Sequence, residues 1–182
     1  MNVAVVGCGP VGLSMVALAK QMGAGKVIMS GHHQSRLAVA RKLGADMAFS
    51  SLDQDVVETI RKNMPEGVDL FIDCVGRTSI IDQGMQVVKE NGKIGLYGIG
   101  MHTGDLIDWD KAPYNFNIHS VQWPIPLEEK AVHEEVIGYL TEGKLNLKDF
   151  VSHTLPVEAF EEGFGLVRAR EGLKVALTFG TD

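Results

Sequence analysis

A glycine-rich turn between an apolar run and a helix-forming run is the feature that most constrains this chain. Residues 3–6 read Val-Ala-Val-Val, residues 7–12 read Gly-Cys-Gly-Pro-Val-Gly, and residues 13–20 favour a helix. A strand, a tight glycine turn and a helix in this order form the first half of a βαβ unit. The motif therefore predicts a parallel sheet with helices packed against it.

Each glycine of the turn has a separate physical reason to be there. Gly7 allows the tight bend, Gly9 lets the backbone approach a pyrophosphate, and Gly12 lets helix and strand pack closely. The N-terminus of the following helix offers unpaired N–H groups to an anion. The turn thus favours dinucleotide binding over two alternatives, a purely structural turn and a site for a different nucleotide.

Short apolar runs rich in Val and Ile alternate with amphipathic stretches along the chain, and residues 98–117 form a long excursion between two of them. Such alternation is typical of strands buried on both faces of a parallel sheet. The predicted fold class is therefore α/β, a doubly wound, parallel, six-stranded sheet of the Rossmann type. The expected strands are residues 2–6, 26–30, 46–49, 68–74, 92–98 and 116–121, and the expected helices are residues 11–22, 34–43, 53–63, 79–90 and 128–141.

The predicted domain boundary falls after residue 143. Residues 1–143 form the dinucleotide-binding Rossmann domain, and residues 144–182 form a C-terminal tail with a helix at 157–168 and a strand at 174–179. The apolar residues of the tail pack either on the Rossmann domain, where they complete its core, or on another part of a longer protein.

The segment after the expected second strand bears on which coenzyme binds. NAD-specific domains place an Asp or Glu about 20 residues beyond the glycines, where it binds the ribose hydroxyls. Residues 28–36 contain no carboxylate, so no negative charge there repels a ribose 2′-phosphate. This favours NADP over NAD, unless the histidines are simply solvated and Arg36 covers the adenine or caps the next helix. The candidate residues around the phosphate are Ser30, Gly31, His32, His33 and Arg36.

Charge, hydropathy and cysteine content exclude several classes of partner. The formal net charge is -6 and the chain has no run of Lys and Arg, so nucleic acid is not an expected ligand. No apolar run approaches the roughly 20 residues needed to cross a bilayer, and no basic leader begins the sequence. We therefore expect a cytoplasmic protein without membrane association. The two cysteines are too few for a disulfide framework or a four-thiolate zinc site.

No side chain stands out as catalytic or metal-binding. The 6 histidines are scattered without the spacing of a metal site. Asp69 and Asp73 are separated by about 13 Å along an expected strand, too far for a carboxylate pair, and Asp73 is better interpreted as shaping the following loop. Cys8 is either a thiol activated by the helix N-terminus or a small filler residue, and we favour the filler. We therefore assign no catalytic residue and no metal ligand.

Five segments in a fixed order carry a family resemblance. They are residues 7–13 (GCGPVGL), 19–27 (AKQMGAGKV), 36–46 (RLAVARKLGAD), 68–76 (VDLFIDCVG) and 92–98 (GKIGLYG). Together they resemble the cofactor-binding domain of the medium-chain dehydrogenase/reductase family, particularly its zinc-dependent alcohol and polyol dehydrogenases. The resemblance extends over nearly all of the chain and is far more specific than any one segment.

The resemblance implies a set of cofactor-binding residues, taken over position by position. They are Gly7, Gly9, Pro10, Val11 and Gly12 at the pyrophosphate, Arg36 by the adenosine ribose, Cys74, Val75, Gly76 and Arg77 after the fourth strand, Tyr97, Gly98 and Ile99 at the nicotinamide end, and Lys174 near the phosphates.

The resemblance also implies an activity that this chain does not carry by itself. Family members have a separate catalytic domain before this one, and zinc-dependent members bind zinc there. Here the first strand follows Met1 directly. We therefore expect one part of an NAD(P)-dependent alcohol or polyol dehydrogenase, inactive alone, with any zinc in the missing catalytic domain, on which the tail then packs.

The expected reaction is hydride transfer between a nicotinamide coenzyme and an alcohol, polyol or sugar. The resemblance further implies a homo-oligomer that pairs through the edge of the sheet. The alternative function is a stand-alone NAD(P)-sensing regulatory module, and a methyltransferase is disfavoured by the same segments.

Overall fold

A computed structural model describes residues 1–100, 107–121 and 126–180. Contacts between residues divide the chain into two compact units, Met1–Lys130 and Ala131–Asp182, and each is described by itself. Because these units are defined by contacts alone, the expected division into folding domains at residues 1–143 and 144–182 stays a prediction.

The first unit alternates strands and helices in chain order. Its elements are β1 (Asn2–Val6), α1 (Pro10–Gln21), β2 (Lys26–Gly31), α2 (Gln34–Lys42), β3 (Met47–Ser50), α3 (Val56–Asn63), β4 (Val68–Asp73), α4 (Thr78–Val87), β5 (Val88–Leu96), the 3-10 helix η1 (Trp109–Lys111) and β6 (Asn117–Ser120). A further helix, α5 (Pro126–Thr141), begins in this unit and continues into the second.

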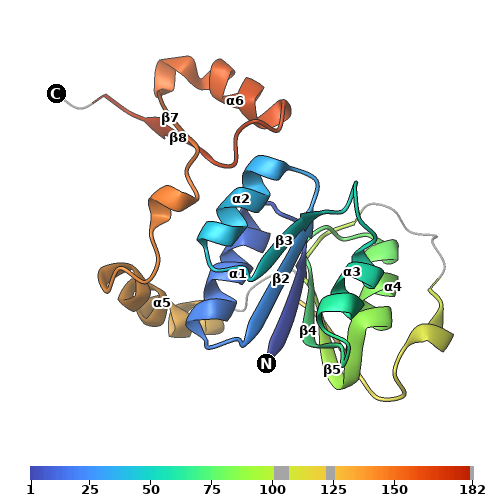
Figure 1. Ribbon diagram of the computed structural model, residues 1–182. Coiled ribbons are helices and arrows are strands. Elements are labelled where there is room, and N and C mark those ends of the chain that lie inside the picture. Colours follow the sequence, from blue (N-terminus) through green and yellow to red (C-terminus); the bar gives the residue numbers. More distant parts are fainter. Residues whose placement is uncertain (101–106, 122–125, 181–182) are drawn as a thin grey trace. The chain divides into compact units, whose positions relative to one another are not determined.

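The strands of the first unit form one parallel sheet in the order β3-β2-β1-β4-β5-β6. Helices α1 and α2 lie on one side of the sheet, and α3 and α4 lie on the other (Figure 1). The chain therefore winds outward in one direction from β1 and then in the other from β4. This confirms the predicted doubly wound, six-stranded α/β fold.

Strand register brings the carboxyl ends of the central strands to one edge of the sheet. Val6 of β1 pairs with Ser30 of β2 and with Asp73 of β4, and Asp73 pairs with Leu96 of β5. The loops after these strands therefore leave the sheet side by side. In open α/β sheets, ligands bind at this edge, where the winding direction changes.

The core of the first unit lies on both faces of the sheet. Val5 and Val6 are neighbours in β1 and point to opposite faces, yet both are buried, as expected when helices cover each face. Phe71, Ile60 and Met85 join β4, α3 and α4 in one apolar cluster. Among the described residues, no helix combines the length and the apolar character that crossing a membrane requires.

The helix expected over residues 53–63 begins later, at Val56. Asp55 precedes it with an extended backbone, and its carboxylate accepts the Glu58 N–H at 2.7 Å. This is an N-cap, which satisfies one of the unpaired N–H groups of the first turn. The expected start was wrong because the N-cap formed by Asp55 and Glu58 sets the first residue of the helix.

The helix expected over residues 79–90 was also wrong at its end. Helix α4 ends at Val87, and β5 begins at Val88, whose buried side chain lies opposite Val68 of β4. The register then shifts, with Asn91 at a φ of 60°, before the regular pairing resumes. Residues 89–91 are polar enough to suit a helix end, and the pairing of Val88 with β4 is what begins a strand here.

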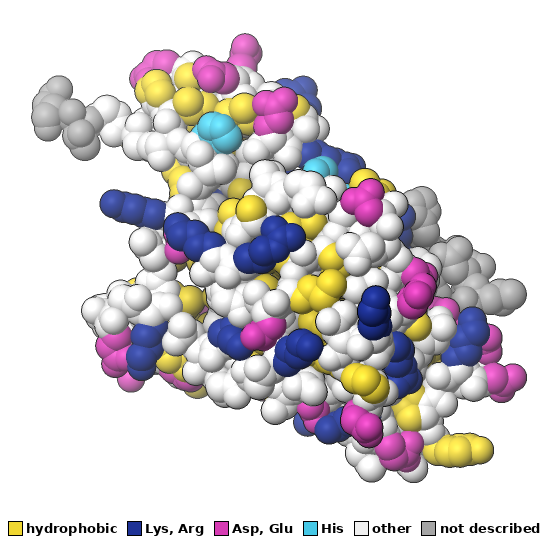
Figure 2. Space-filling model, in the orientation of Figure 1, with side chains coloured by type: hydrophobic (Ala, Val, Ile, Leu, Met, Phe, Trp, Pro, Cys, Tyr) yellow, Lys and Arg dark blue, Asp and Glu magenta, His cyan; other side chains and the backbone are white. Residues whose placement is uncertain are grey.

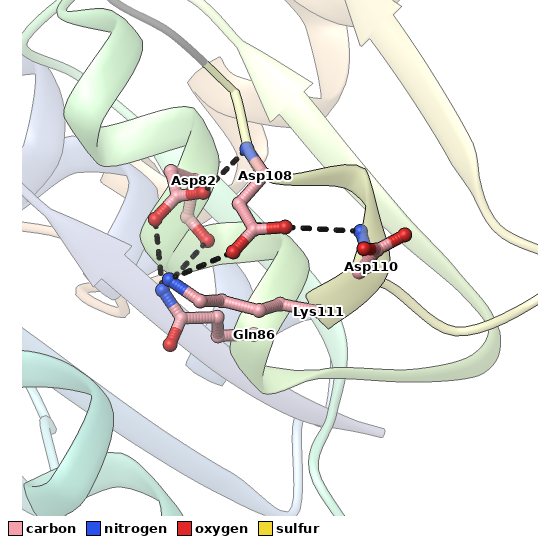
Figure 3. Close-up of polar contacts among 5 residues, drawn as sticks. All are labelled: Asp82, Gln86, Asp108, Asp110 and Lys111. Atoms are coloured by element: carbon pink, nitrogen blue, oxygen red, sulfur yellow. Dashed lines mark hydrogen bonds and ion pairs between the residues drawn. The ribbon is translucent and has the colours of Figure 1, made fainter.

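Part of the excursion expected at residues 98–117 is anchored to α4, and residues 101–106 lie outside the described residues. Asp82 of α4 accepts the Asp108 N–H at 3.1 Å and the Gln86 side-chain amide at 2.8 Å (Figure 3). Asp108 in turn accepts the Asp110 N–H and pairs with Lys111 at 3.3 Å, which closes η1. The residues that pack this segment against the core are Ile107, Ala112 and Phe116.

Over residues 131–180, the second unit contains the larger part of α5, a small parallel pair of strands and one further α-helix. Its further elements are η2 (Leu147–Asp149), β7 (His153–Pro156), η3 (Val157–Ala159), α6 (Phe160–Arg168) and β8 (Val175–Thr178). The helix expected over 157–168 is η3 followed by α6, and the strand expected over 174–179 is β8. Strand β7 was not expected. It is extended because it pairs with β8, and α6 packs on both strands at Gly163.

The carboxylate of Asp69 holds the amino end of β4 in place. Its carboxylate accepts the Asn2 N–H at 2.6 Å and pairs with Lys89. The hydrogen bond from Lys89, and then that from Asn2, hold the pKa of Asp69 below its usual value. We expect Asp69→Asn to lower the free energy of unfolding by about 1 kcal/mol at pH 7, as measured in urea.

A carboxyl group with a lowered folded pKa stabilises the fold above its unfolded pKa, and this contribution is lost as the pH falls through the folded pKa. The difference between wild type and Asp69→Asn should therefore shrink below about pH 3.9. Asp53→Asn, at an exposed position, serves as the control. An equal effect of Asp69→Asn at pH 7 and at pH 3 would contradict the assignment to the charged carboxylate.

Candidate active-site cleft

The turn after β1 is held tightly by its first and last glycines. Gly7 has a φ of 107°, and a Cβ there would lie 2.9 Å from Val75 Cγ2 in the loop after β4. A Cβ on Gly12 would lie 1.8 Å from the carbonyl oxygen of Gly7. Both positions therefore exclude any side chain, and Gly12 lets α1 start directly against the end of β1.

Gly9 differs from the other two glycines of the turn. It has an ordinary extended backbone, with φ -77° and ψ 177°, and a Cβ there would meet no atom within 4 Å. Neither backbone conformation nor packing within the described chain requires a glycine at this position. The open space in front of Gly9 is available to a ligand.

Helix α1 presents its N-terminus at this open space. Gly9 is its N-cap and Pro10 its first residue, no side chain caps the helix, and no acidic residue lies in its first turn. The N–H groups of the first turn have no acceptor within an α-helix, and the helix dipole makes this end positive. The arrangement suits a bound anion such as a pyrophosphate.

Asp73 organises the opposite wall. Its side chain is buried, and its Oδ1 accepts the N–H groups of Val75 at 2.7 Å and Gly76 at 2.9 Å. Its backbone carbonyl accepts the N–H groups of Tyr97 and Gly98, each at 3.0 Å. One residue thus fixes both the loop after β4 and the loop after β5, in agreement with the loop-shaping role expected from the sequence.

These two loops touch through glycine backbones. A Cβ on Gly98 would lie 2.1 Å from the Gly76 nitrogen, and a Cβ on Gly100 would lie 1.5 Å from the Gly76 carbonyl oxygen. Only glycine at both positions allows this approach. Gly100 was not among the expected site residues, although its spacing from Gly98 in the sequence was a readable signal.

The turn and the two loops enclose a cavity of about 320 Å³. The residues that line it are Gly9, Pro10, Val11, Gly12, Cys74, Tyr97, Gly98 and Ile99. All eight were expected from the sequence at a coenzyme site. The structure thus brings together the residues assigned to the pyrophosphate and those assigned to the nicotinamide end, and Gly7, Val75 and Gly76 shape the walls behind them.

The side chain of Cys74 forms an uncharged part of the cavity wall. Burial, followed by the neighbouring charge of Asp73, raises the pKa of the Cys74 thiol to about 12. The thiol is therefore neutral at physiological pH and a poor nucleophile. Among the residues that the structure describes, no group of three or more His, Cys, Asp or Glu side chains is placed to hold a metal ion.

The residues expected around the adenosine ribose lie at the end of β2 and beyond it. Gly31 is buried, His32 is exposed, His33 is the N-cap residue of α2, and Arg36 lies in the first turn of that helix. Next to them, the buried Ser30 hydroxyl has no hydrogen-bond partner within the described part of the chain. Buried polar groups are normally paired, so this hydroxyl points to a missing partner.

Two further expected residues lie elsewhere. Arg77 is exposed and forms the N-cap of α4, directly after the loop that Asp73 fixes. Lys174 belongs to the second unit, just before β8. The roles expected for these residues stay predictions.

Gly98→Ala tests the glycine contact between the loops. The added Cβ would overlap the Gly76 nitrogen, so we expect the free energy of unfolding to fall by about 1–3 kcal/mol in urea. Gly95→Ala, in β5 just before the loop of Gly98, is the matched control, because a Cβ at Gly95 meets only the Phe71 carbonyl oxygen, at 3.9 Å. Equal stability losses in the two variants would argue against the contact.

Comparison with known proteins gives the fold a context. The sequence pattern of the family described as zinc-binding dehydrogenase matches residues 10–121. L-threonine 3-dehydrogenase from Bacillus velezensis is 31% identical over 183 residues, which cover 97% of this chain and 50% of that protein. Erythritol/L-threitol dehydrogenase from Mycolicibacterium smegmatis is 30% identical, over 97% of this chain and 48% of that protein.

A solved structure agrees with these relatives. An alcohol dehydrogenase from Thermus sp. ATN1 superimposes with a TM-score of 0.82 at 27% identity, over 98% of this chain and 51% of that one. The chain thus spans about half the length of the relatives that it matches. Because the family pattern covers most of the first unit, including the helix and loops that line the cavity, the chain belongs to the zinc-binding dehydrogenases of the medium-chain dehydrogenase/reductase family.

Proposed function

We propose that the chain is the NAD(P)-binding part of an oxidoreductase that transfers a hydride between a nicotinamide coenzyme and an alcohol, polyol or sugar. The single observation that carries the proposal is Gly9, a glycine required by neither conformation nor packing, at the wall of a cavity beside an uncapped helix N-terminus. The relatives named above, which are dehydrogenases of threonine, tetritols and alcohols, support the reaction class.

The described residues fit a dinucleotide along the whole edge of the sheet. The N–H groups of the first turn of α1 hold the pyrophosphate, which approaches closely over Gly9. The Ser30 hydroxyl gains a partner at the adenosine ribose. Tyr97, Gly98 and Ile99 bind and orient the nicotinamide end, while the neutral Cys74 keeps negative charge away from the cavity wall. The coenzyme, when bound, accepts or supplies the hydride.

NADP(H) is the proposed coenzyme. The end of β2 carries no carboxylate, and His32, His33 and Arg36 follow it directly. A ribose 2′-phosphate would meet hydrogen-bond donors and a guanidinium there rather than a negative charge. In this proposal Arg77 adds positive charge beside the coenzyme, after β4. The role expected for Lys174 near the coenzyme phosphates stays a prediction.

The complete enzyme requires more chain than is present here. We assign the catalytic domain, and with it any zinc, to a part of a longer protein outside this chain, which spans about half the length of the relatives. We assign residues 144–182 to contact with that domain or with the Rossmann domain. In the second unit, α6 packs on β7 and β8 at Gly163, and three large apolar side chains of the same helix are exposed: Phe160, Phe164 and Val167. Figure 2 shows hydrophobic side chains gathered over this helix. A chain without the catalytic domain is expected to bind coenzyme without oxidising alcohols.

Calorimetric titration of the purified chain with NADPH and with NADH tests the coenzyme site. We expect binding of both, tighter for NADPH, and a loss of affinity of about tenfold or more in Gly9→Ala, because the methyl group would occupy the space of the pyrophosphate. Gly138→Ala is the control, since a Cβ at Gly138 also meets nothing within 4 Å but lies on α5. Equal affinities in Gly9→Ala and wild type would remove the observation that carries the proposal.

The outer strand β6 suggests how a second copy binds. It lies at the edge of the sheet, and Ile118 is 40% exposed on it. An unpaired strand edge can pair with another chain. We expect light scattering to give a dimer or larger species for the wild type, and Ile118→Lys to shift it toward monomer.

Val132→Lys, which places the same charge at an exposed apolar residue of α5, is the control for Ile118→Lys. A wild-type chain that stays monomeric at high concentration would contradict pairing through β6.

The cytoplasmic location of the protein stays a prediction.

A further inference from the structure

The side chain of Cys8 occupies the space beside Gly31 at the end of β2. Cys8 is the second residue of the glycine turn and is 4% exposed. A Cβ on Gly31 would lie 2.3 Å from Cys8 Sγ, 2.7 Å from Cys8 Cβ and 3.1 Å from the Cys8 nitrogen. Real Cβ atoms essentially never lie within 3.0 Å of a heavy atom in another part of the chain, as this one would of Cys8 Sγ and Cys8 Cβ, so the side chain of Cys8 and a side chain at position 31 exclude each other.

Packing, and not backbone conformation, is what requires a glycine at position 31. The positive-φ glycines include Gly7 and Gly76 but not Gly31, which continues the extended backbone of β2. Any residue could adopt that conformation if the space beside it were free. The contact with Cys8 is therefore the reason that position 31 carries no side chain.

The backbone on both sides of this contact is held in place. The Gly7 N–H donates to the Ser30 carbonyl at 2.9 Å, and the Ser51 N–H donates to the Gly31 carbonyl at 3.0 Å. Gly31 also pairs with Ser50 of β3. The Gly7–Ser30 hydrogen bond holds the turn against the end of β2, and the interactions with Ser50 and Ser51 hold the end of β2 against β3. Neither side of the contact can move away without losing one of them, so a side chain at position 31 is accommodated by removing that of Cys8.

Position 31 also decides the charge at the proposed ribose site. A carboxylate at the end of the second strand accepts hydrogen bonds from the ribose hydroxyls of NAD and repels the 2′-phosphate of NADP. Specificity of this kind depends on the repulsive group as much as on the attractive ones. The residue that forbids a carboxylate here therefore acts on coenzyme choice.

We propose that Cys8 is a specificity-determining residue, which favours NADP(H) by filling the space that an acidic side chain at position 31 needs. The proposal rests on the coenzyme site proposed above. Cys8 then acts as a packing residue and not as a reactive thiol. A change of coenzyme requires positions 8 and 31 to change together.

The test compares three variants, Gly31→Asp, Cys8→Gly with Gly31→Asp, and Cys8→Ser with Gly31→Asp. Thermal unfolding is measured without coenzyme, and NADH and NADPH affinities are measured by calorimetry. We expect Gly31→Asp to lower Tm by about 5 °C, and Cys8→Gly to recover most of this loss in the double variant. Cys8→Ser keeps an atom at the γ position and should recover none of it.

The coenzyme affinities test whether Cys8 affects coenzyme specificity. The ratio of NADH to NADPH affinity should rise about tenfold or more in the Cys8→Gly, Gly31→Asp variant over wild type. It should not rise to this level in Gly31→Asp alone or with Cys8→Ser. Equal ratios in all three variants would overturn the proposal, as would equal Tm values.

Failure of the proposed function gives a different result. A wild-type chain that binds neither coenzyme would refute the coenzyme site and the role of Cys8 in specificity, while the Tm comparison would still report on the contact between positions 8 and 31. Gly31→Ala separates size from charge, because it adds the Cβ without the carboxylate. It should lower Tm clearly with Cys8 present and much less with Cys8→Gly, which leaves only the 3.1 Å contact with the nitrogen of residue 8.

Discussion

The approach of α1 to the end of β1 is the constraint on which the rest of the site depends. The Gly12 backbone lies so close to the Gly7 carbonyl that no side chain fits between them. This contact fixes where the helix starts, and so where its unpaired N–H groups point. Gly7 in turn packs against Val75, so the same turn also sets the position of the loop after β4. A small displacement of α1 would therefore move two walls of the cavity together.

Backbone geometry, more than charged side chains, builds the remaining walls. Asp73 uses its charge internally, on N–H groups of its own loop and of the loop after β5. Gly76 and Gly98 let these loops touch, and Cys74 faces the cavity as a neutral thiol. Such a site has N–H donors, shape and apolar surface. These properties suit the binding and orientation of a dinucleotide.

Much of the fold could be predicted from the sequence because its elements have strong local signals. Strands β1 to β4 are built on short apolar runs, and the glycine turn sets the first βαβ unit. The errors fall where a segment depends on a distant partner. Val88 starts β5 because it lies opposite Val68, and His153 starts β7 because it lies opposite Val175. The start of α3 is an exception, since Asp55 and Glu58 formed a readable capping pair.

The sequence by itself determined the Rossmann fold class, the glycine turn, and the segments that were expected to meet at the coenzyme. The fold class and the turn follow from periodicity and from glycine positions, which act over a few neighbouring residues. The meeting of the segments at the coenzyme was implied by the family resemblance. Only the tertiary structure decided that Gly9 faces open space, that Asp73 holds two loops, and that Cys8 fills the space beside Gly31. Each of these depends on the distance between atoms of segments far apart in the chain, which sequence spacing does not specify.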